Sequence, residues 1–187
     1  AVGVKEDMAE TAMLRGTKRM DFLNTWLLTI LIFLPTAGAG LVLIARDRET
    51  IRRTALATTI LTFALSLLLF FTFKWGLGGP YDYLENPVGG KPGVVQMVTA
   101  AKWIPAFNIE YKVGIDGFSF PLVILSTFIR MLACLASWNI EKMLKGYMIL
   151  FLLLESGILG VFLSLDFFLF YVFFEVSLLP MYFLIGI

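Results

Sequence analysis

Residues 147–187 of the chain are YMILFLLLESGILGVFLSLDFFLFYVFFEVSLLPMYFLIGI. Asp166 divides this stretch into two apolar runs, 147–165 and 167–187, and a single glutamate interrupts each run. A helix needs roughly 20 apolar residues to cross the hydrocarbon core of a bilayer. The two runs therefore predict a pair of antiparallel transmembrane helices, and they indicate an all-α integral membrane protein.

Three further apolar runs precede that pair, at 22–45, 54–73 and 118–138. Of the 187 residues, 59% are hydrophobic and 16% are charged, whereas soluble proteins have about 25% charged residues. We therefore expect five transmembrane helices within a membrane domain over 20–187. Before it, residues 1–19 form a polar tail, and residues 74–117 form a long loop outside the cytoplasm.

The short turns set the predicted orientation in the membrane. The turn after the first run contains four arginines, and the turn after the third run contains Lys142 and Lys145. Short loops rich in Lys and Arg stay in the cytoplasm. We therefore expect both turns on the cytoplasmic side and the turn at Asp166 on the other side.

Composition also limits the chemistry. The formal net charge is +1, which gives no reason to expect nucleic acid as a partner, because such proteins carry a basic surface. With no His and a single Cys, the usual protein ligands of haem, zinc and iron–sulfur clusters are missing. We expect no cofactor and no metal on this chain, and the lipid bilayer as its surroundings.

The end of the long loop has a different pattern from the rest. Phe107, Ile109, Tyr111 and Val113 alternate with polar residues at the spacing of a half-buried strand. A cap by Asp116 or Ser119 can then start the third helix. This segment is either a docking surface for a neighbour or an ordinary loop.

Small residues mark two of the predicted helices. Thr58, Thr62 and Ser66 recur every four residues, and so do the residues of a second set: Ser156, Gly160 and Ser164. Small side chains at this spacing let helices approach closely in lipid, so the two sets predict packing faces.

Three charged residues inside the predicted spans are the candidates for chemistry, because an isolated charge in hydrocarbon is costly. Glu155 lies eleven residues before Asp166 and Glu175 lies nine after it, which places both roughly 13 to 17 Å below the outer surface. Arg130, fourteen residues beyond Asp116, reaches a similar depth. We therefore predict one layer of three ionisable groups from three helices.

Glu175 is the main candidate for proton transfer, because Pro180 leaves the carbonyl of Val176 without its helical donor and predicts a kink that water can enter. The alternative is a static buried ion pair. Glu155 is a second candidate for proton transfer. Arg130, a candidate modulator, shares a stripe with three small polar residues that is either a wet lining or a polar helix interface: Thr127, Cys134 and Ser137.

Three stretches carry a family resemblance. Residues 160–175, GVFLSLDFFLFYVFFE, are followed by 180–187, PMYFLIGI, and residues 113–119, VGIDGFS, precede the third helix. Together they resemble the antiporter-like subunit M family of bacterial proton-translocating NADH:quinone oxidoreductase, respiratory complex I. The glutamate and proline motif is typical of antiporter-like subunits.

This resemblance implies a function for the chain. It implies the N-terminal part of a fold with about fourteen transmembrane helices and inverted repeats, in which Glu175 matches the key glutamate of the fifth helix. It further implies a translocase subunit without a redox centre in the bacterial inner membrane, with antiporter-like paralogues as partners and with NADH, FMN, iron–sulfur clusters and quinone on other subunits. The alternatives are a subunit of a cation/proton antiporter or membrane-bound hydrogenase, and a purely structural membrane anchor.

Overall fold

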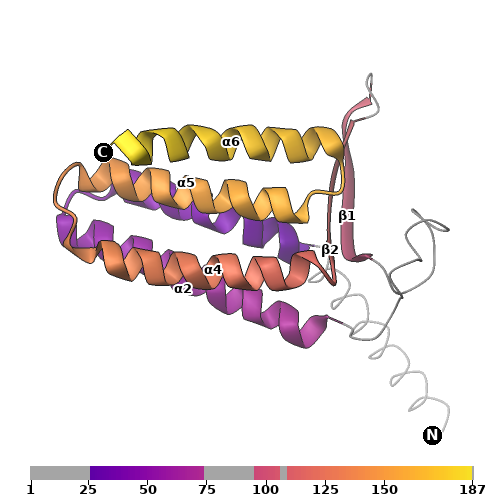
Figure 1. Ribbon diagram of the computed structural model, residues 1–187, viewed down its shortest axis with the longest axis horizontal. Coiled ribbons are helices and arrows are strands. Elements are labelled where there is room, and N and C mark those ends of the chain that lie inside the picture. The colour runs from indigo at the N-terminus through magenta and orange to yellow at the C-terminus, as the bar shows by residue number, and fades with distance from the viewer. Residues whose placement is uncertain (1–25, 74–94, 106–108, 187) are drawn as a thin grey trace, which may run out of the picture.

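The structure, a computed structural model, describes residues 26–73, 95–105 and 109–186. This part of the chain has five helices that are long and apolar enough to cross a membrane, which confirms the predicted fold class. Figure 1 shows them side by side in one bundle, with a β-hairpin across one end. The bounds are the first helix (Trp26–Ile44), α2 (Arg48–Thr72), α4 (Ser119–Ala136) continued by the 3-10 turn η2 (Ser137–Asn139), α5 (Leu144–Leu163) and α6 (Phe167–Gly186). The predicted tail, residues 1–19, lies outside the described residues.

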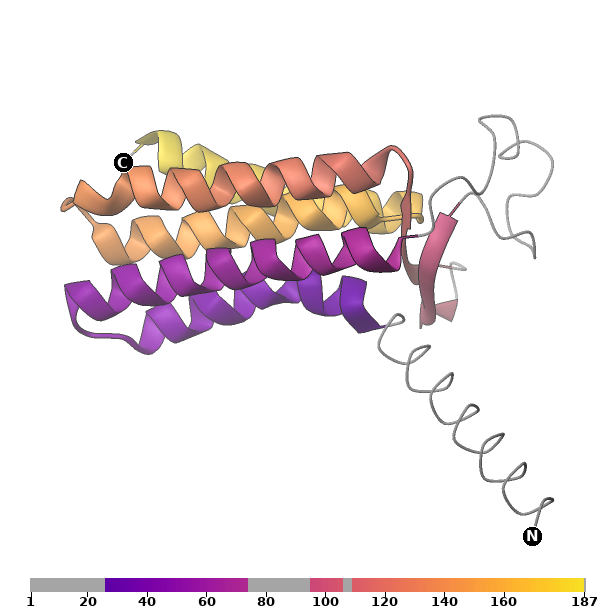
Figure 2. The same cartoon turned by 90° about the horizontal axis from the view of Figure 1, so that it is seen from below.

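The two ends of the bundle differ in charge. The turn before α2 and the turn between α4 and α5 lie at the same end, and the turn between α5 and α6 lies at the other (Figures 1 and 2). Arg52, in the second turn of α2, joins the start of this helix to the turn between α4 and α5, because its Nη2 donates to the carbonyl of Ile140 at 3.1 Å. We call this end, with the arginines of the first turn and Lys142 and Lys145 of the second, the basic end.

The opposite end, the hairpin end, is closed by strands β1 (Val95–Ile104) and β2 (Ile109–Asp116), which pair antiparallel. Strand β2 is the segment in which alternation predicts a strand, although Phe107 lies outside the described residues. Strand β1 was not predicted. The hairpin is fastened to the α5–α6 turn, since Val113 forms a β-bridge with Ser164 and the amide of Leu165 donates to the carbonyl of Lys112 at 2.9 Å.

The predicted cap at the start of α4 is present and reciprocal. The amide of Ser119 donates to Oδ1 of Asp116 at 2.6 Å, and the amide of Asp116 donates to Oγ of Ser119 at 3.0 Å. These bonds satisfy backbone donors that a helix start leaves free. They fix the direction in which α4 leaves the hairpin.

Two apolar clusters form the core. The first lies toward the hairpin and unites both strands with all five of the described helices through residues such as Leu28, Ile115, Val123, Leu163 and Phe173. The second lies toward the basic end and includes Val42, Ala55, Cys134, Met148 and Leu152.

Small residues let α5 and α6 approach closely. A Cβ atom added at Gly157 would meet Ser177, and one added at Gly160 would overlap the ring of Phe173. Thr58, Thr62 and Ser66 are likewise buried along α2. Ser66 of the first predicted set hydrogen-bonds Thr127 of α4, and Gly160 of the second set packs on α6. Ser164 of the second set lies after the end of α5 and forms a β-bridge with Val113 of the hairpin, so it is not part of a helix packing face.

We expect Gly160→Ala to loosen the α5–α6 contact, because the added methyl group overlaps the Phe173 ring. Overpacking of this kind destabilises a folded protein by about 1–3 kcal/mol. A lower thermal unfolding midpoint of the detergent-solubilised protein would show it. Gly146→Ala is the matched control, since a Cβ at Gly146 meets nothing within 4 Å. Equal midpoints for the two variants would contradict the prediction.

Candidate functional site

Glu155 is buried in the middle of the bundle. Its side chain lies on α5 and is 1% exposed. Among the residues that the structure describes, neither carboxyl oxygen has a hydrogen-bond partner. Buried polar side chains are nearly always hydrogen-bonded, so this carboxyl group requires an explanation.

Arg130 of α4 lies beside Glu155, and the two side chains attract each other electrostatically. The guanidinium group does not hydrogen-bond the carboxyl group. Its Cζ instead lies 5.2 Å from the centre of the Phe151 ring, in the geometry of a cation–π contact. The structure therefore brings together two of the three residues of the predicted layer.

The stripe that contains Arg130 lies at an interface between helices. Thr127 shares a hydrogen bond of 2.8 Å with Ser66 of α2. Cys134 is buried and interacts with Thr59, which also lies on α2. Ser137 shares a hydrogen bond of 2.8 Å with the hydroxyl of Tyr147 on α5. Of the two predicted alternatives, the structure supports the polar helix interface.

Tyr147 and Phe151 complete the site and were not predicted. With Glu155 they follow each other at four-residue spacing on α5 and so lie on one face of the helix. Their rings stack with centroids 6.1 Å apart, and Arg130 also interacts electrostatically with Tyr147. The four-residue spacing from Glu155 was the signal in the sequence that could have identified them.

Glu175 lies elsewhere. The buried side of α6 carries Leu169, Phe173, Ser177 and Pro180, whereas Glu175 is exposed. Because it is two residues from both Phe173 and Ser177, helical geometry turns it to the opposite side. Depth was predicted from residue counts, which do not determine the direction in which a side chain points. Helix α6 continues past Pro180 to Gly186, and the kink stays a prediction.

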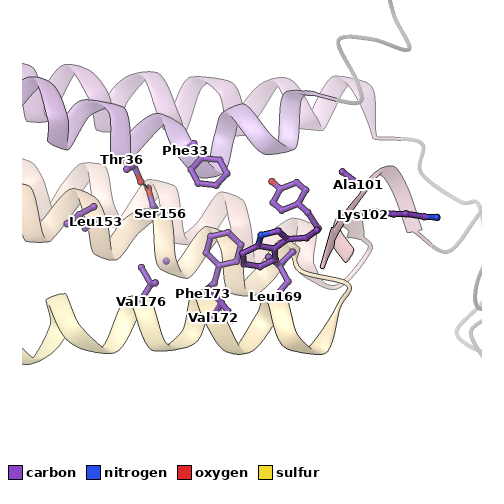
Figure 3. A pocket seen from close by; sticks show the side chains of 13 residues that line it. Phe33, Thr36, Ala101, Lys102, Leu153, Ser156, Leu169, Val172, Phe173 and Val176 are labelled. Carbon is purple, nitrogen blue, oxygen red and sulfur yellow. Dashed lines mark hydrogen bonds between the residues drawn. The ribbon is translucent and has the colours of Figure 1, made fainter. Parts of the chain in front are cut away.

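A separate cavity of about 520 Å³ opens between the first helix, α5, α6 and the hairpin. Figure 3 shows Phe33, Leu169, Val172 and Phe173 around it, with Thr36 and Ser156 at one side. The hydroxyl of Thr36 donates to Oγ of Ser156 at 2.7 Å. The lining is mostly apolar, and neither Glu155 nor Glu175 contributes to it.

In the described part of the chain, no group of three or more His, Cys, Asp or Glu residues is placed to hold a metal ion. The ionisable groups of the site, Arg130 and Glu155, are a cation and an acid within reach of each other. Such a pair can hold and release a proton.

Comparison with known proteins identifies the family. Residues 93–165 match the model of "NADH-ubiquinone oxidoreductase chain 4, amino terminus". The chain is 39% identical over 168 residues to NADH-quinone oxidoreductase subunit M of Rhodobacter capsulatus, with 86% of this chain and 29% of that protein aligned. The chain belongs to the chain 4 (subunit M) family. It is also 35% identical over 160 residues to NADH-ubiquinone oxidoreductase chain 4 of Marchantia polymorpha, with 84% of this chain and 29% of that protein aligned.

A solved structure has a similar fold. A chain of respiratory complex I from Thermus thermophilus with bound NADH superposes with a TM-score of 0.64 at 26% identity, and the match covers 82% of this chain and 27% of that chain. The chain thus spans less than a third of the length of these relatives. It corresponds to the part of the family fold that the model names the amino terminus.

Proposed function

We propose that this chain is part of a proton-translocating membrane subunit of NADH:quinone oxidoreductase. Quinone reduction elsewhere in the complex drives proton transfer along a polar axis in the middle of the membrane. The observation that carries the proposal is the 39% identity to subunit M over 168 residues, because this match covers 86% of the chain.

Glu175 is the proton-transfer residue in this proposal. Its exposure in the described part of the chain supports a role in contact with other polar groups, since a carboxylate facing lipid near mid-membrane would be costly. The relatives extend over more than three times the aligned length. Their remaining helices offer surfaces that can cover this face of α6 and supply a titratable neighbour.

Glu155 is a second proton-transfer residue, and Arg130 modulates it. Burial favours the neutral acid and a nearby cation favours the carboxylate. A small movement of the guanidinium group between the Phe151 ring and the carboxyl group would therefore change the proton affinity of Glu155. Geometry supports this role, because Arg130 is close to Glu155 without being locked to it by a hydrogen bond.

The redox chemistry belongs to other subunits in this proposal. NADH, FMN, iron–sulfur clusters and quinone bind there, and this chain is a non-redox subunit. Its neighbours are antiporter-like paralogues, and it lies in a bacterial inner membrane as a multi-pass protein. The names of the relatives favour this assignment over a cation/proton antiporter, a membrane-bound hydrogenase or a structural anchor.

Purification of the tagged full-length protein from its own membranes tests the assignment. We expect it to bring down a complex that contains flavin and iron–sulfur clusters and that reduces quinone with NADH. An assembly that lacks flavin and exchanges sodium for protons would instead identify a stand-alone antiporter. Purification without any partner would favour the membrane anchor.

A further inference from the structure

The apolar cavity beside α6 extends from the hairpin to the middle of the helix bundle. Its lining includes Ala101 and Trp103 of β1 at one end, and Leu153 of α5 and Val176 of α6 at the other. Val176 lies nine residues after the start of α6, about 14 Å below the hairpin end at 1.5 Å per helical residue. Leu153 lies ten residues before the end of α5, about 15 Å below the same end. The hydrocarbon core is about 30 Å thick, so the cavity has the depth of one lipid leaflet.

The hydroxyl groups of the cavity lining already have partners. Thr36 donates to Ser156 at 2.7 Å, and the hydroxyl of Tyr111 donates to Oγ1 of Thr29 at 3.2 Å. A buried water molecule needs two to four polar partners, and the rest of the lining offers few. An empty space would deprive the apolar walls of van der Waals contacts. The cavity therefore suits an apolar occupant.

The side of the cavity is open to the surroundings of the bundle. Phe33 of the first helix and Val176 of α6 both line it, and each is 46% exposed. Both side chains belong to helices that are apolar enough to cross a membrane, so lipid can reach the cavity from the side. A further transmembrane helix would be 10–12 Å across and would run through the whole membrane. The cavity is instead bounded by β1 at the hairpin end and ends at mid-membrane, which fits the length of an acyl chain.

Lys102 and Trp103 supply polar groups where the cavity meets the hairpin. The side chain of Lys102 points away from the cavity and from the helices (Figure 3), toward the level at which the head group of a lipid would lie. Glu110 is its partner in the strand pairing, but within the described residues Lys102 forms no salt bridge. Trp103 is 48% exposed, and its indole N–H is a donor of the kind found at membrane interfaces. A cation and an N–H donor together suit a phosphate group.

We propose that this cavity binds one phospholipid from the leaflet on the hairpin side. One acyl chain lies between the first helix, α5 and α6, and the phosphate group lies beside Lys102 and Trp103. The bound chain completes the packing between the first helix and α6, which otherwise meet here through the rings of Phe33 and Phe173, with centroids 6.3 Å apart. The inference goes beyond the proposed function, because it involves neither Glu155 nor Glu175.

The test uses phosphatidylglycerol with a photoactivatable diazirine at the end of one acyl chain. The full-length protein, with the subunits that purify with it, is placed in phosphatidylcholine vesicles that contain a small fraction of this probe. After illumination, peptide mass spectrometry identifies the labelled residues. We expect preferential labelling of Leu153 and Val176, and labelling near Trp103 when the diazirine is next to the glycerol instead. Labelling spread evenly over the exposed helix faces, or labelling of those faces without the cavity, would overturn the proposal.

Lys102→Gln tests the contact with the phosphate group. We expect the labelling of Leu153 at limiting probe to fall about fivefold, because one cation near the head group is lost. Lys112→Gln on β2 is the matched control, since Lys112 does not line the cavity, and it should retain the original labelling. A diacylglycerol probe with the same diazirine chain has no phosphate and should label Lys102→Gln and the unsubstituted protein equally. Equal labelling of the two lysine variants by the phosphatidylglycerol probe would contradict the proposed head-group site.

Val176→Trp tests the place of the acyl chain, because the larger side chain fills the inner end of the cavity. We expect the labelling of Leu153 to be lost. Leu178→Trp introduces the same side chain two residues further along α6, on the opposite side of the helix, and should be labelled normally. Retained labelling of Leu153 in Val176→Trp would overturn the proposal. Labelling requires no NADH, so a labelled protein that transports no protons would keep the lipid site and refute the proposed function, and an unlabelled one that transports normally would do the reverse.

Discussion

Glu175→Gln is expected to abolish proton transport driven by NADH in the complete complex while the complex still assembles. Glutamine has nearly the same shape as glutamate and keeps a carbonyl oxygen as acceptor, but it cannot take up and release a proton. Since Glu175 lies on the exposed side of α6, opposite Phe173 and Ser177, the change leaves the α5–α6 contact untouched. We therefore expect loss of function without loss of packing.

The loss of proton transport can be measured in inverted vesicles. A pH-sensitive dye reports the acidification of their interior after NADH is added. Electron transfer from NADH to a soluble artificial acceptor should be unchanged, because it does not depend on the membrane subunit. Glu141→Gln makes the same chemical change in the exposed turn between α4 and α5 and should pump normally. Normal pumping by the Glu175 variant would remove this residue from the transfer path, and loss of assembly would favour a structural role.

Arg130→Leu is expected to lower the stability of the protein substantially. Removing the cation leaves Glu155, which is 1% exposed, without the charge that compensates it within the described part of the chain. Breaking a fully buried ion pair destabilises a protein by about 3–5 kcal/mol. Arg130 is only partly buried and Glu155 can become neutral. We therefore expect the free energy of unfolding to fall by about 2 kcal/mol and the thermal unfolding midpoint to be clearly lower.

The double variant Arg130→Leu, Glu155→Leu supplies the decisive comparison. It removes both charges and replaces them with side chains that suit the surrounding apolar cluster, so most of the lost stability should return. If the double variant is as unstable as the sum of the two single variants, the residues do not interact. If Arg130→Leu alone melts at the original temperature, the cation does not stabilise the buried acid.

The helices could be predicted because their length is set by the thickness of the bilayer. In lipid, a long apolar run can satisfy its own backbone hydrogen bonds only as a helix. The uniformly apolar composition of these helices also limited the prediction of the site, because it does not show in which direction a side chain points. Helix α6 is apolar on nearly every side, so its sequence does not indicate which face packs on α5. The structure places Arg130 beside Glu155, whereas the direction of Glu175 could not be read from residue counts.

Strand β1 was missed for a different reason. Residues 95–104 are VQMVTAAKWI, which do not alternate between apolar and polar positions, and the pairing has register shifts between Gln96 and Thr99. Met97 there has a positive φ of 56°, which side chains rarely favour. The strand is formed because β2 provides hydrogen-bond partners, and that information is not local.

The β-bridge between Val113 and Ser164 has a consequence for biogenesis. Strand β2 leaves the ribosome well before α5 and the following Ser164 have been made. During synthesis the edge of β2 that pairs with Ser164 therefore lacks this partner. Contacts between distant parts of a chain form late and leave exposed strand edges in the meantime. Nascent chains arrested ahead of α5 should consequently be cut by protease within the hairpin, and chains arrested after α6 has emerged should resist.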